Sequence, residues 1–172
     1  MGIILAGMVV ITMLLVASGV MFSAFLDTSV SGAQSLTSLT QANVQRAGSA
    51  LDITSAAFSG GGSTDLTLQM DNTGSQSVVR FAEMDVIVEY TDPSDNLVLT
   101  RLGYVASDIG NNLWTLSTTG VQPDSFNPGI WDSDESIFID LRVDPEVKAG
   151  TAALIIVGTP WATSDQTSAT AP

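Results

Sequence analysis

The pattern of apolar and polar residues changes twice along this chain of 172 residues. Residues 1–26 read MGIILAGMVVITMLLVASGVMFSAFL and contain no charge; the first charged residue is Asp27. As a helix rising ~1.5 Å per residue, this segment would extend about 39 Å. The hydrocarbon core of a bilayer measures about 30 Å. The pattern therefore predicts an N-terminal helix that is able to span a membrane.

Between residues 28 and 50 the apolar residues recur at three- or four-residue spacing, as in Val30, Ala33, Leu36 and Leu39. This spacing places them on one face of a helix, opposite Ser, Thr, Gln and Asn. A Ser/Thr-rich stalk is the competing interpretation, because Ser, Thr and Gly are mediocre helix formers. We expect one continuous hydrophobic and amphipathic helix over residues 1–50, about 75 Å long.

From residue 51 onward, short runs with alternating apolar residues are separated by turn residues, which is typical of strands. The predicted strands are 51–58, 64–71, 80–90, 96–104, 112–117, 135–143 and 151–158. This number of strands suits an Ig-like antiparallel β-sandwich over residues 51–161. The predicted fold class is therefore α+β, a long N-terminal helix followed by a sandwich. Residues 162–172 lack periodicity and are expected to form a flexible Ser/Thr-rich tail.

The alternation also predicts which side chains point into the sandwich. The clearest strand has every second residue apolar from 137 to 143. The expected inward-facing residues are Leu66, Leu68, Met70, Phe81, Met84, Val86, Val88, Ile137, Ile139, Leu141 and Val143. The spacing slips between Phe81 and Met84, which suggests a bulge.

Composition removes most enzyme chemistry. The chain has neither Cys nor His, so thiol nucleophiles, disulfides, Cys/His zinc sites and histidine bases are excluded. A net charge of −13 with five basic residues disfavours nucleic-acid binding. We expect a non-enzymatic protein without cofactor or metal.

Two groups of residues keep a binding interpretation open beside a structural one. The acidic residues Asp132, Asp134 and Glu135, and the pair Asp92 and Asp95, offer oxygen ligands to Ca²⁺, but neither segment has EF-hand spacing and acidic turn residues are commonly just solvated. Trp114, Trp131 and Trp161 suit either a sugar-binding platform or the core and its interfaces.

The N-terminal helix has features that favour packing against other helices. Small residues recur four apart, Gly2 with Ala6 and Gly19 with Ser23, which lets helices approach closely in apolar surroundings. The predicted packing residues share an apolar or small side chain on this helix. They are Gly2, Ile3, Ile4, Leu5, Ala6, Met8, Val9, Ile11, Leu14, Leu15, Gly19, Phe22, Phe25, Leu26, Leu36 and Leu39.

The segment GIILAGMVVITMLLVASGVMFSAFLDTS, followed by a polar continuation and a β-domain, resembles the archaellin family, the type IV pilin-like filament subunits of the archaellum. Later segments are similar to archaellins too: LTLQMDNTGSQSVVRFAEMDVIVEY resembles a strand, Asn-x-Gly turn and strand of these proteins, and PGIWDSDESIFIDLRVDP resembles the segment before their last strands. Bacterial type IV pilins usually carry Glu at the fifth position of the mature chain, where this sequence has Leu5. Archaellins lose a short basic leader, and none precedes Met1 in this sequence, so the sequence is expected either to correspond to a mature form or to depart from the family.

The resemblance implies a homopolymer of identical subunits in an extracellular filament for swimming motility. It implies membrane insertion before assembly, and archaellum-type motor and platform proteins as partners. An adhesive pilus-like subunit remains an alternative, as does a membrane-anchored accessory, stator or surface-binding module.

Overall fold

The computed structural model describes residues 2–59 and 62–172. The chain divides into two compact units, residues 1–43 and residues 44–172, and each is described by itself. The first unit consists of helix, and the second contains the end of that helix and all the strands. We refer to the second as the β-unit.

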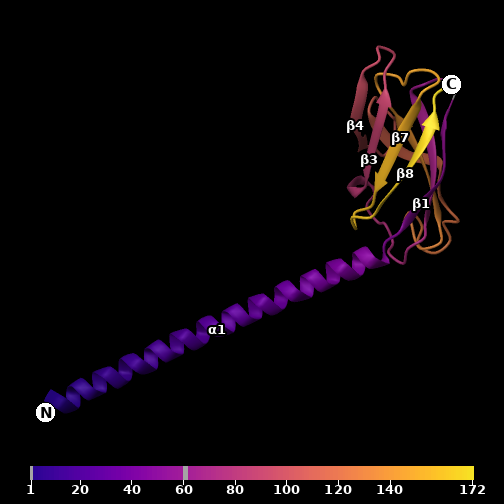
Figure 1. Cartoon of the computed structure of the whole chain (residues 1–172). Coiled ribbons are helices and arrows are strands. Elements are labelled where there is room, and N and C mark those ends of the chain that lie inside the picture. Colours follow the sequence, from indigo (N-terminus) through magenta and orange to yellow (C-terminus); the bar gives the residue numbers. More distant parts are fainter. Residues whose placement is uncertain (1, 60–61) are drawn as a thin grey trace. The chain divides into compact units, whose positions relative to one another are not determined.

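The predicted continuous helix is confirmed. Helix α1 (Gly2–Gly48) comprises 47 residues without interruption, so the Ser/Thr-rich stretch after Asp27 is helical and not an irregular stalk (Figure 1). At ~1.5 Å per residue, α1 is about 70 Å long. Its hydroxyl side chains bond to carbonyls of the preceding turn, as Thr28 does to the Ala24 oxygen at 2.8 Å. These bonds keep the Ser and Thr hydroxyls compatible with helix.

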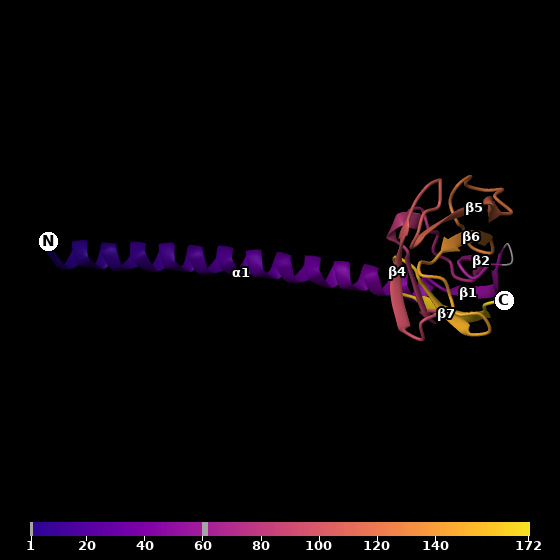
Figure 2. The same ribbon diagram turned by 90° about the horizontal axis from the view of Figure 1, so that it is seen from above.

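The β-unit contains eight described strands and one short 3₁₀ helix. In spatial order the strands run β1-β2-β6-β5-β4-β3-β7-β8. Figure 2 looks along the unit and shows β5, β6, β2 and β1 on one side, with β4 and β7 on the other. The bounds are β1 (Leu51–Phe58), β2 (Asp65–Asn72), η1 (Phe81–Glu83), β3 (Asp85–Thr91), β4 (Leu97–Tyr104), β5 (Leu113–Gln122), β6 (Ser136–Arg142), β7 (Ala152–Gly158) and β8 (Ser164–Thr170).

The α+β prediction, a long helix followed by a sandwich, is confirmed, but the sandwich is not wholly antiparallel. Strands β4 and β5 pair in parallel through Gly103 with Leu113 and Tyr104 with Trp114. This short pairing joins the two layers at one edge. The prediction of a purely antiparallel sheet is therefore wrong at this position, because β5 begins beside the end of β4 and runs on in the same direction.

The inward faces predicted from alternation form the core. Leu66, Leu68 and Met70 on β2 face Leu141, Ile139 and Ile137 on β6 in antiparallel register. All of these side chains are buried, as are Phe81, Met84, Val86, Val88 and Val143. The slip after Phe81 is not a bulge, since residues 81–83 form the 3₁₀ helix η1 before β3 begins.

The prediction of a flexible C-terminal tail is wrong. Residues 164–170 form β8, which pairs with β7 along its whole length. Ala169 and Ala171 are buried against the core although they add little apolar surface. The strand depends on backbone hydrogen bonds to β7 rather than on its own hydrophobicity. Its sequence therefore shows no apolar alternation from which it could be predicted.

A turn after β2 closes over the end of α1. The N–H groups of Ser75 and Gln76 donate to the Gly48 oxygen at 2.7 and 3.2 Å, and Gly74 N–H donates to the Ala50 oxygen at 3.2 Å. These bonds satisfy the Gly48 carbonyl at the end of the helix and the Ala50 carbonyl just after it. Residue 74 must be glycine for this approach, because a Cβ there would lie 2.4 Å from the Ala50 nitrogen.

Candidate functional site

The most unusual surface of the molecule is that of α1 itself. The structure describes the side chains of its residues from Gly7 onward, and between Gly7 and Asn43 every one of them is exposed. Met8 and Met21 are about as exposed as Leu14 and Leu15, on different sides of the helix. A soluble helix would bury such a surface against its own domain. The described part of α1 therefore has the composition of a core helix without a core around it.

The predicted packing residues all lie on α1. Exposed apolar side chains among them are Met8, Val9, Ile11, Leu14, Leu15, Phe22, Phe25, Leu26, Leu36 and Leu39. Gly2 and Gly19 have open space where a side chain would lie. The backbone of Ile3, Ile4, Leu5 and Ala6 is helical, while their side chains lie outside the described part of the structure. Contacts of these residues with another helix therefore stay a prediction.

The few polar groups in the apolar segment are satisfied within the helix. Thr12 donates to the Met8 oxygen at 2.8 Å, Ser18 to the Leu14 oxygen at 2.7 Å, and Ser23 to the Val20 oxygen at 2.9 Å. An unpaired hydroxyl costs free energy in an apolar medium, and these bonds remove that cost. Residues 7–26 are thus suited to lipid or to a dry helix bundle. The helix is long and apolar enough to cross a membrane by length and composition.

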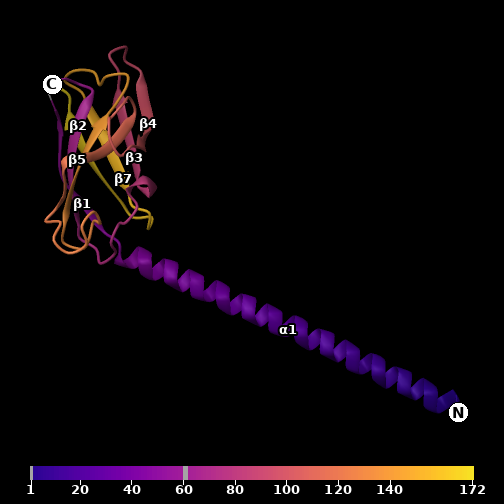
Figure 3. The ribbon, with the colours of Figure 1, turned by 180° about the vertical axis from the view of Figure 1, so that it is seen from behind.

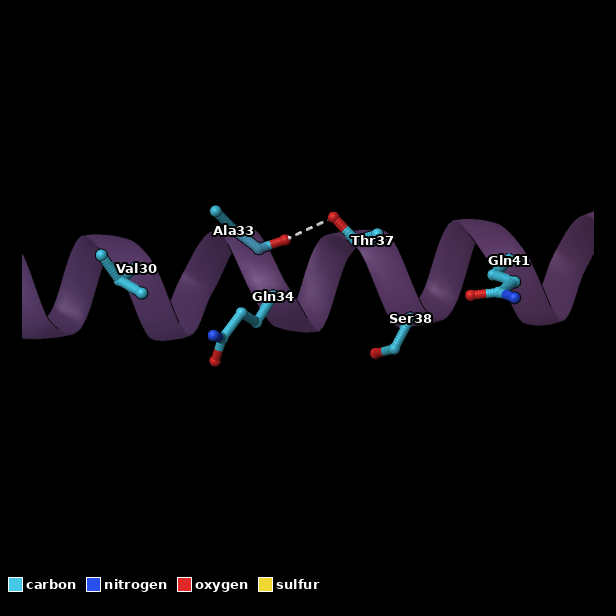
Figure 4. A pocket seen from close by; sticks show the side chains of 6 residues that line it. All are labelled: Val30, Ala33, Gln34, Thr37, Ser38 and Gln41. Carbon is cyan, nitrogen blue, oxygen red and sulfur yellow. Dashed lines mark hydrogen bonds between the residues drawn. The ribbon is translucent and has the colours of Figure 1, made fainter.

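Beyond Asp27, α1 keeps one apolar face. Val30, Leu36 and Leu39 are exposed to 55%, 67% and 61%. Beside them runs an open groove lined by Val30, Ala33, Gln34, Thr37, Ser38 and Gln41 (Figure 4). Thr37 turns its hydroxyl back to the Ala33 oxygen at 2.9 Å, as Figure 4 shows. A small side chain between longer ones gives this face relief of the kind into which another helix can pack.

The candidate calcium-binding carboxylates are engaged in turns. Both carboxylate oxygens of Asp92 accept hydrogen bonds, from Ser94 N–H, from Asn96 N–H and from the Asn96 side chain. Hydrogen bonds from Asn96, mainly from its side chain, hold the pKa of Asp92 below its usual value. Asp132 accepts from Ser77 at 2.5 Å and from Asn127 at 2.8 Å. Within residues 2–59 and 62–172, no group of three or more acids gathers to hold a metal ion.

The three tryptophans do not form one platform. Trp114 and Trp131 are buried in the core, and the Trp131 indole donates to the Glu135 oxygen at 2.7 Å. Trp161 is half-buried and lines a small pocket with Val78, Val79 and Pro160. The core interpretation therefore holds for two of them. Sequence reasoning missed the pocket, because its sides come from segments about 80 residues apart.

Neither a protein-family model nor a curated protein sequence matches the chain. Solved structures do. The archaeal flagellum of Methanospirillum hungatei strain JF1 superposes with a TM-score of 0.59 at 14% identity, covering 96% of this chain and 92% of that chain. The archaellum periplasmic stator protein FlaG from Sulfolobus acidocaldarius gives a TM-score of 0.49 at 15% identity, covering 70% and 98%. The archaellum periplasmic stator protein complex of FlaF and FlaG from the same organism gives a TM-score of 0.49 at 14% identity, covering 69% of this chain and 86% of that chain.

The superposition on the archaeal flagellum, with its TM-score of 0.59, supports the architecture of the chain. A long apolar helix followed by a β-sandwich is the class of structure to which it belongs. Over almost its whole length it has the fold of the archaeal flagellum subunit.

Proposed function

We propose that this chain is a structural subunit of an extracellular helical filament of the archaellum type, assembled through α1. The observation that carries the proposal is the surface of α1, where apolar side chains remain exposed over the whole described length. The likeness to the archaeal flagellum subunit, which covers both the helix and the β-unit, supports it.

The surface of α1 limits where a subunit can exist. Transferring apolar surface from water is worth about 25 cal/mol per Å². A free monomer would leave the surface of residues 7–26 in water. In a membrane the same side chains contact lipid, and in a filament core they contact identical helices. Transfer of the helix from the membrane into the filament therefore changes the exposure of its apolar side chains to water very little. Assembly is then driven by close packing between helices.

Charge separates the part that packs from the part that faces water. Asp27 and Arg46 are the only charged residues of α1, and only Asp27 lies outside the β-unit, so the β-unit carries all but one of the 13 net negative charges. Acidic β-units on the outside keep filaments soluble and apart from one another. Contacts that join different surfaces of the same chain do not close, and they generate an open helical polymer.

The subunit is non-enzymatic in this proposal. It is inserted in the membrane before assembly, and afterwards it lies in a homopolymer at the cell surface. Motor and platform proteins of the archaellum are its proposed partners, and rotation of the filament would serve swimming. In a non-rotating adhesive pilus the subunit would pack in the same way.

The test is to shear intact cells, pellet the released material, image it by electron microscopy and identify its protein by mass spectrometry. The expected result is thin filaments in which this chain is the dominant band. Recovery of the chain only from the membrane fraction would overturn the proposal.

A second candidate is a membrane-anchored accessory, stator or surface-binding module, because α1 is long enough to span a bilayer as a single anchor. The two candidates differ in residues 27–43. In a filament the apolar face of this segment packs against other helices, whereas in an anchored module it is a solvated stalk.

A further inference from the structure

The β-unit carries an exposed aromatic side chain that its own core does not use. Phe126, on the loop between β5 and β6, is 85% exposed. The loop is held in place around it. The Asp124 carboxylate accepts Gly129 N–H at 3.1 Å, Ile130 N–H donates to the Asn127 oxygen at 2.9 Å, and the Asn127 amide bonds to Asp132. Phe126 is therefore presented on an ordered loop rather than on a free chain.

An apolar pocket lies at the same end of the β-unit. Val78, Val79, Pro160 and Trp161 line it, with Arg80 and Glu83 at its side, and its volume is about 190 Å³. An apolar cavity of about 150 Å³ is enough to bind benzene. The volume of the pocket is therefore comparable to that which a benzene ring requires. Val79 is itself 60% exposed, so the entrance is open to a neighbouring molecule.

Hydrogen bonds place both features at the end where the chain enters the β-unit. Val78 bridges to Trp131, near the end of the Phe126 loop. Thr159, next to Pro160, contacts the Ser49 hydroxyl at 3.2 Å. Figures 1 and 3 show the loop between β5 and β6 and the turn between β7 and β8 on opposite sides of this end. Phe126 is not among the residues that line the pocket of its own chain.

We infer that Phe126 of one subunit fills the Val78–Val79–Pro160–Trp161 pocket of the next subunit in the filament. This inference rests on the proposed function and identifies a contact between β-units. The occupant is a second copy of this chain, because the projecting ring and a pocket of comparable volume are both exposed at the same end of the β-unit, and the ring does not line the pocket of its own chain. Such a contact is heterologous and leaves one free ring and one free pocket at the two ends of every row, so it propagates.

Charge complementarity supports the same occupant. Arg80 beside the pocket has a side chain that is 73% exposed, and its ion pair is with Glu83 three residues away at 2.9 Å. Exposed pairs of this kind contribute little, so Arg80 remains available to another carboxylate. Asp124 lies two residues before Phe126, and its oxygens retain acceptor capacity beyond the single Gly129 N–H. Seating Phe126 in the pocket brings an acid towards an arginine.

The chain contains no cysteine, so introduced thiols report only the designed contact. The test is a chain with both Phe126→Cys and Val79→Cys, assembled into filaments and treated with a short thiol-to-thiol cross-linker. The expected result is a ladder of covalent multimers in denaturing electrophoresis. Chains with either cysteine alone should migrate as monomers in denaturing electrophoresis. A chain with Phe126→Cys and Leu97→Cys should do so too, because Leu97 is the first residue of β4 and does not line the pocket.

Filaments of the double variant that give no ladder would overturn the inference while leaving the filament function intact. A covalent dimer from either single cysteine would also overturn it, because that result requires like surfaces to meet. If no variant or wild-type filament forms at all, the proposed function itself has failed.

A second measurement decides the matter if the double cysteine variant does not assemble. Phe126→Ser should lower the temperature at which filaments dissociate, whereas Phe126→Leu should largely retain it, because leucine still fills the pocket. Equal dissociation temperatures for Phe126→Ser and wild-type filaments would overturn the inference.

Discussion

The guanidinium of Arg142 on β6 donates to both carboxylate oxygens of Asp65 at the start of β2, with Nε 2.6 Å from Oδ1 and Nη2 2.9 Å from Oδ2. The same guanidinium donates to the Ile109 oxygen at 3.1 Å. The two strands and the loop before β5 are thereby joined at one point. The hydrogen bonds from Arg142 are the main cause that lowers the pKa of Asp65 below its usual value.

This lowered pKa makes the β-unit sensitive to acid. Because the folded-state pKa of Asp65 lies below its unfolded value of about 3.9, the ion pair stabilises fully above that pH, and its contribution is lost as pH falls through the folded pKa. Arg142→Gln should lower the free energy of unfolding at pH 7 measurably, since both side chains are only about one-third exposed. Urea titration of the β-unit alone, followed by the fluorescence of its buried tryptophans, measures this.

The difference in the free energy of unfolding between Arg142→Gln and wild type should shrink when the urea titration is repeated at a pH below the folded-state pKa of Asp65. Arg101 offers the matched control, because its pair with Asp85 is 65% and 55% exposed. Arg101→Gln should leave the free energy of unfolding nearly unchanged. An equal effect of both substitutions would contradict the account.

The β-unit should fold without the rest of α1. Its core lies between its own two layers, and the residues 1–43 form a separate compact unit. Residues 49–172 retain Ser49, whose hydroxyl lies 2.7 Å from that of Thr163. Expressed alone, this fragment should be a soluble β-rich monomer by circular dichroism and size-exclusion chromatography. A fragment that aggregates or lacks strand signal would show that the β-unit depends on α1.

Strand β8 should be essential although it reads as a tail. Ala169 is 6% exposed and pairs with the fully buried Ala153, so Ala169→Asp places an unpaired charge in the core. We expect a loss of about 3 kcal/mol or more in the free energy of unfolding of the β-unit. Its neighbour Ser168 is exposed, and Ser168→Asp should change stability by less than about 0.5 kcal/mol. Comparable urea midpoints for the two variants would contradict the structure.

The contrast between β6 and β8 shows what the sequence could predict. Residues 137, 139, 141 and 143 are apolar at every second position, and β6 lies where that alternation placed it, within a residue at each end. Strand β8 buries only small alanines, so its existence depends on the free edge of β7. A strand that forms mainly through backbone hydrogen bonds to its neighbour leaves no hydrophobic pattern in its own sequence.

The candidate site divides in the same way. The surface of α1 could be predicted because its apolar residues are local in sequence and its length follows from helix geometry. The pocket around Trp161 could not, since Val78 and Pro160 meet only after β3, β7 and η1 are in place. The parallel contact of β4 with β5 is a further case, because it depends on where two strands end rather than on what they contain.

The turn after β2 should tolerate no side chain at residue 74. The Cβ of Gly74→Ala would lie 2.4 Å from the Ala50 nitrogen and 2.5 Å from the Gly48 oxygen, both backbone atoms. Overpacking of this kind costs about 1–3 kcal/mol, so the urea midpoint of a β-unit that retains Gly48 should fall. Gly62→Ala is the control, because its Cβ would meet nothing within 4 Å. Equal midpoints for Gly74→Ala and Gly62→Ala would show that the turn is free to move.

The apolar face of α1 beyond Asp27 should decide between a filament subunit and an anchored module. Leu36→Glu and Leu39→Glu each place a charge on that face, where burial against another helix would cost several kcal/mol in every subunit. We expect both variants to reach the membrane and neither to yield sheared filaments. Electron microscopy of the sheared fraction and immunoblotting of the membrane fraction measure the two outcomes separately.

Ser31→Glu adds the same charge within the same segment but on the polar face, about opposite the centre of the apolar face at ~100° per residue. Ser31 is exposed, and it is not among the residues that line the groove of Figure 4. This variant should still assemble, because the added carboxylate keeps contact with water. Normal filament yield from all three variants would leave residues 27–43 as a solvated stalk and favour the anchored module, whereas loss in Leu36→Glu and Leu39→Glu alone requires their face to be buried in the polymer.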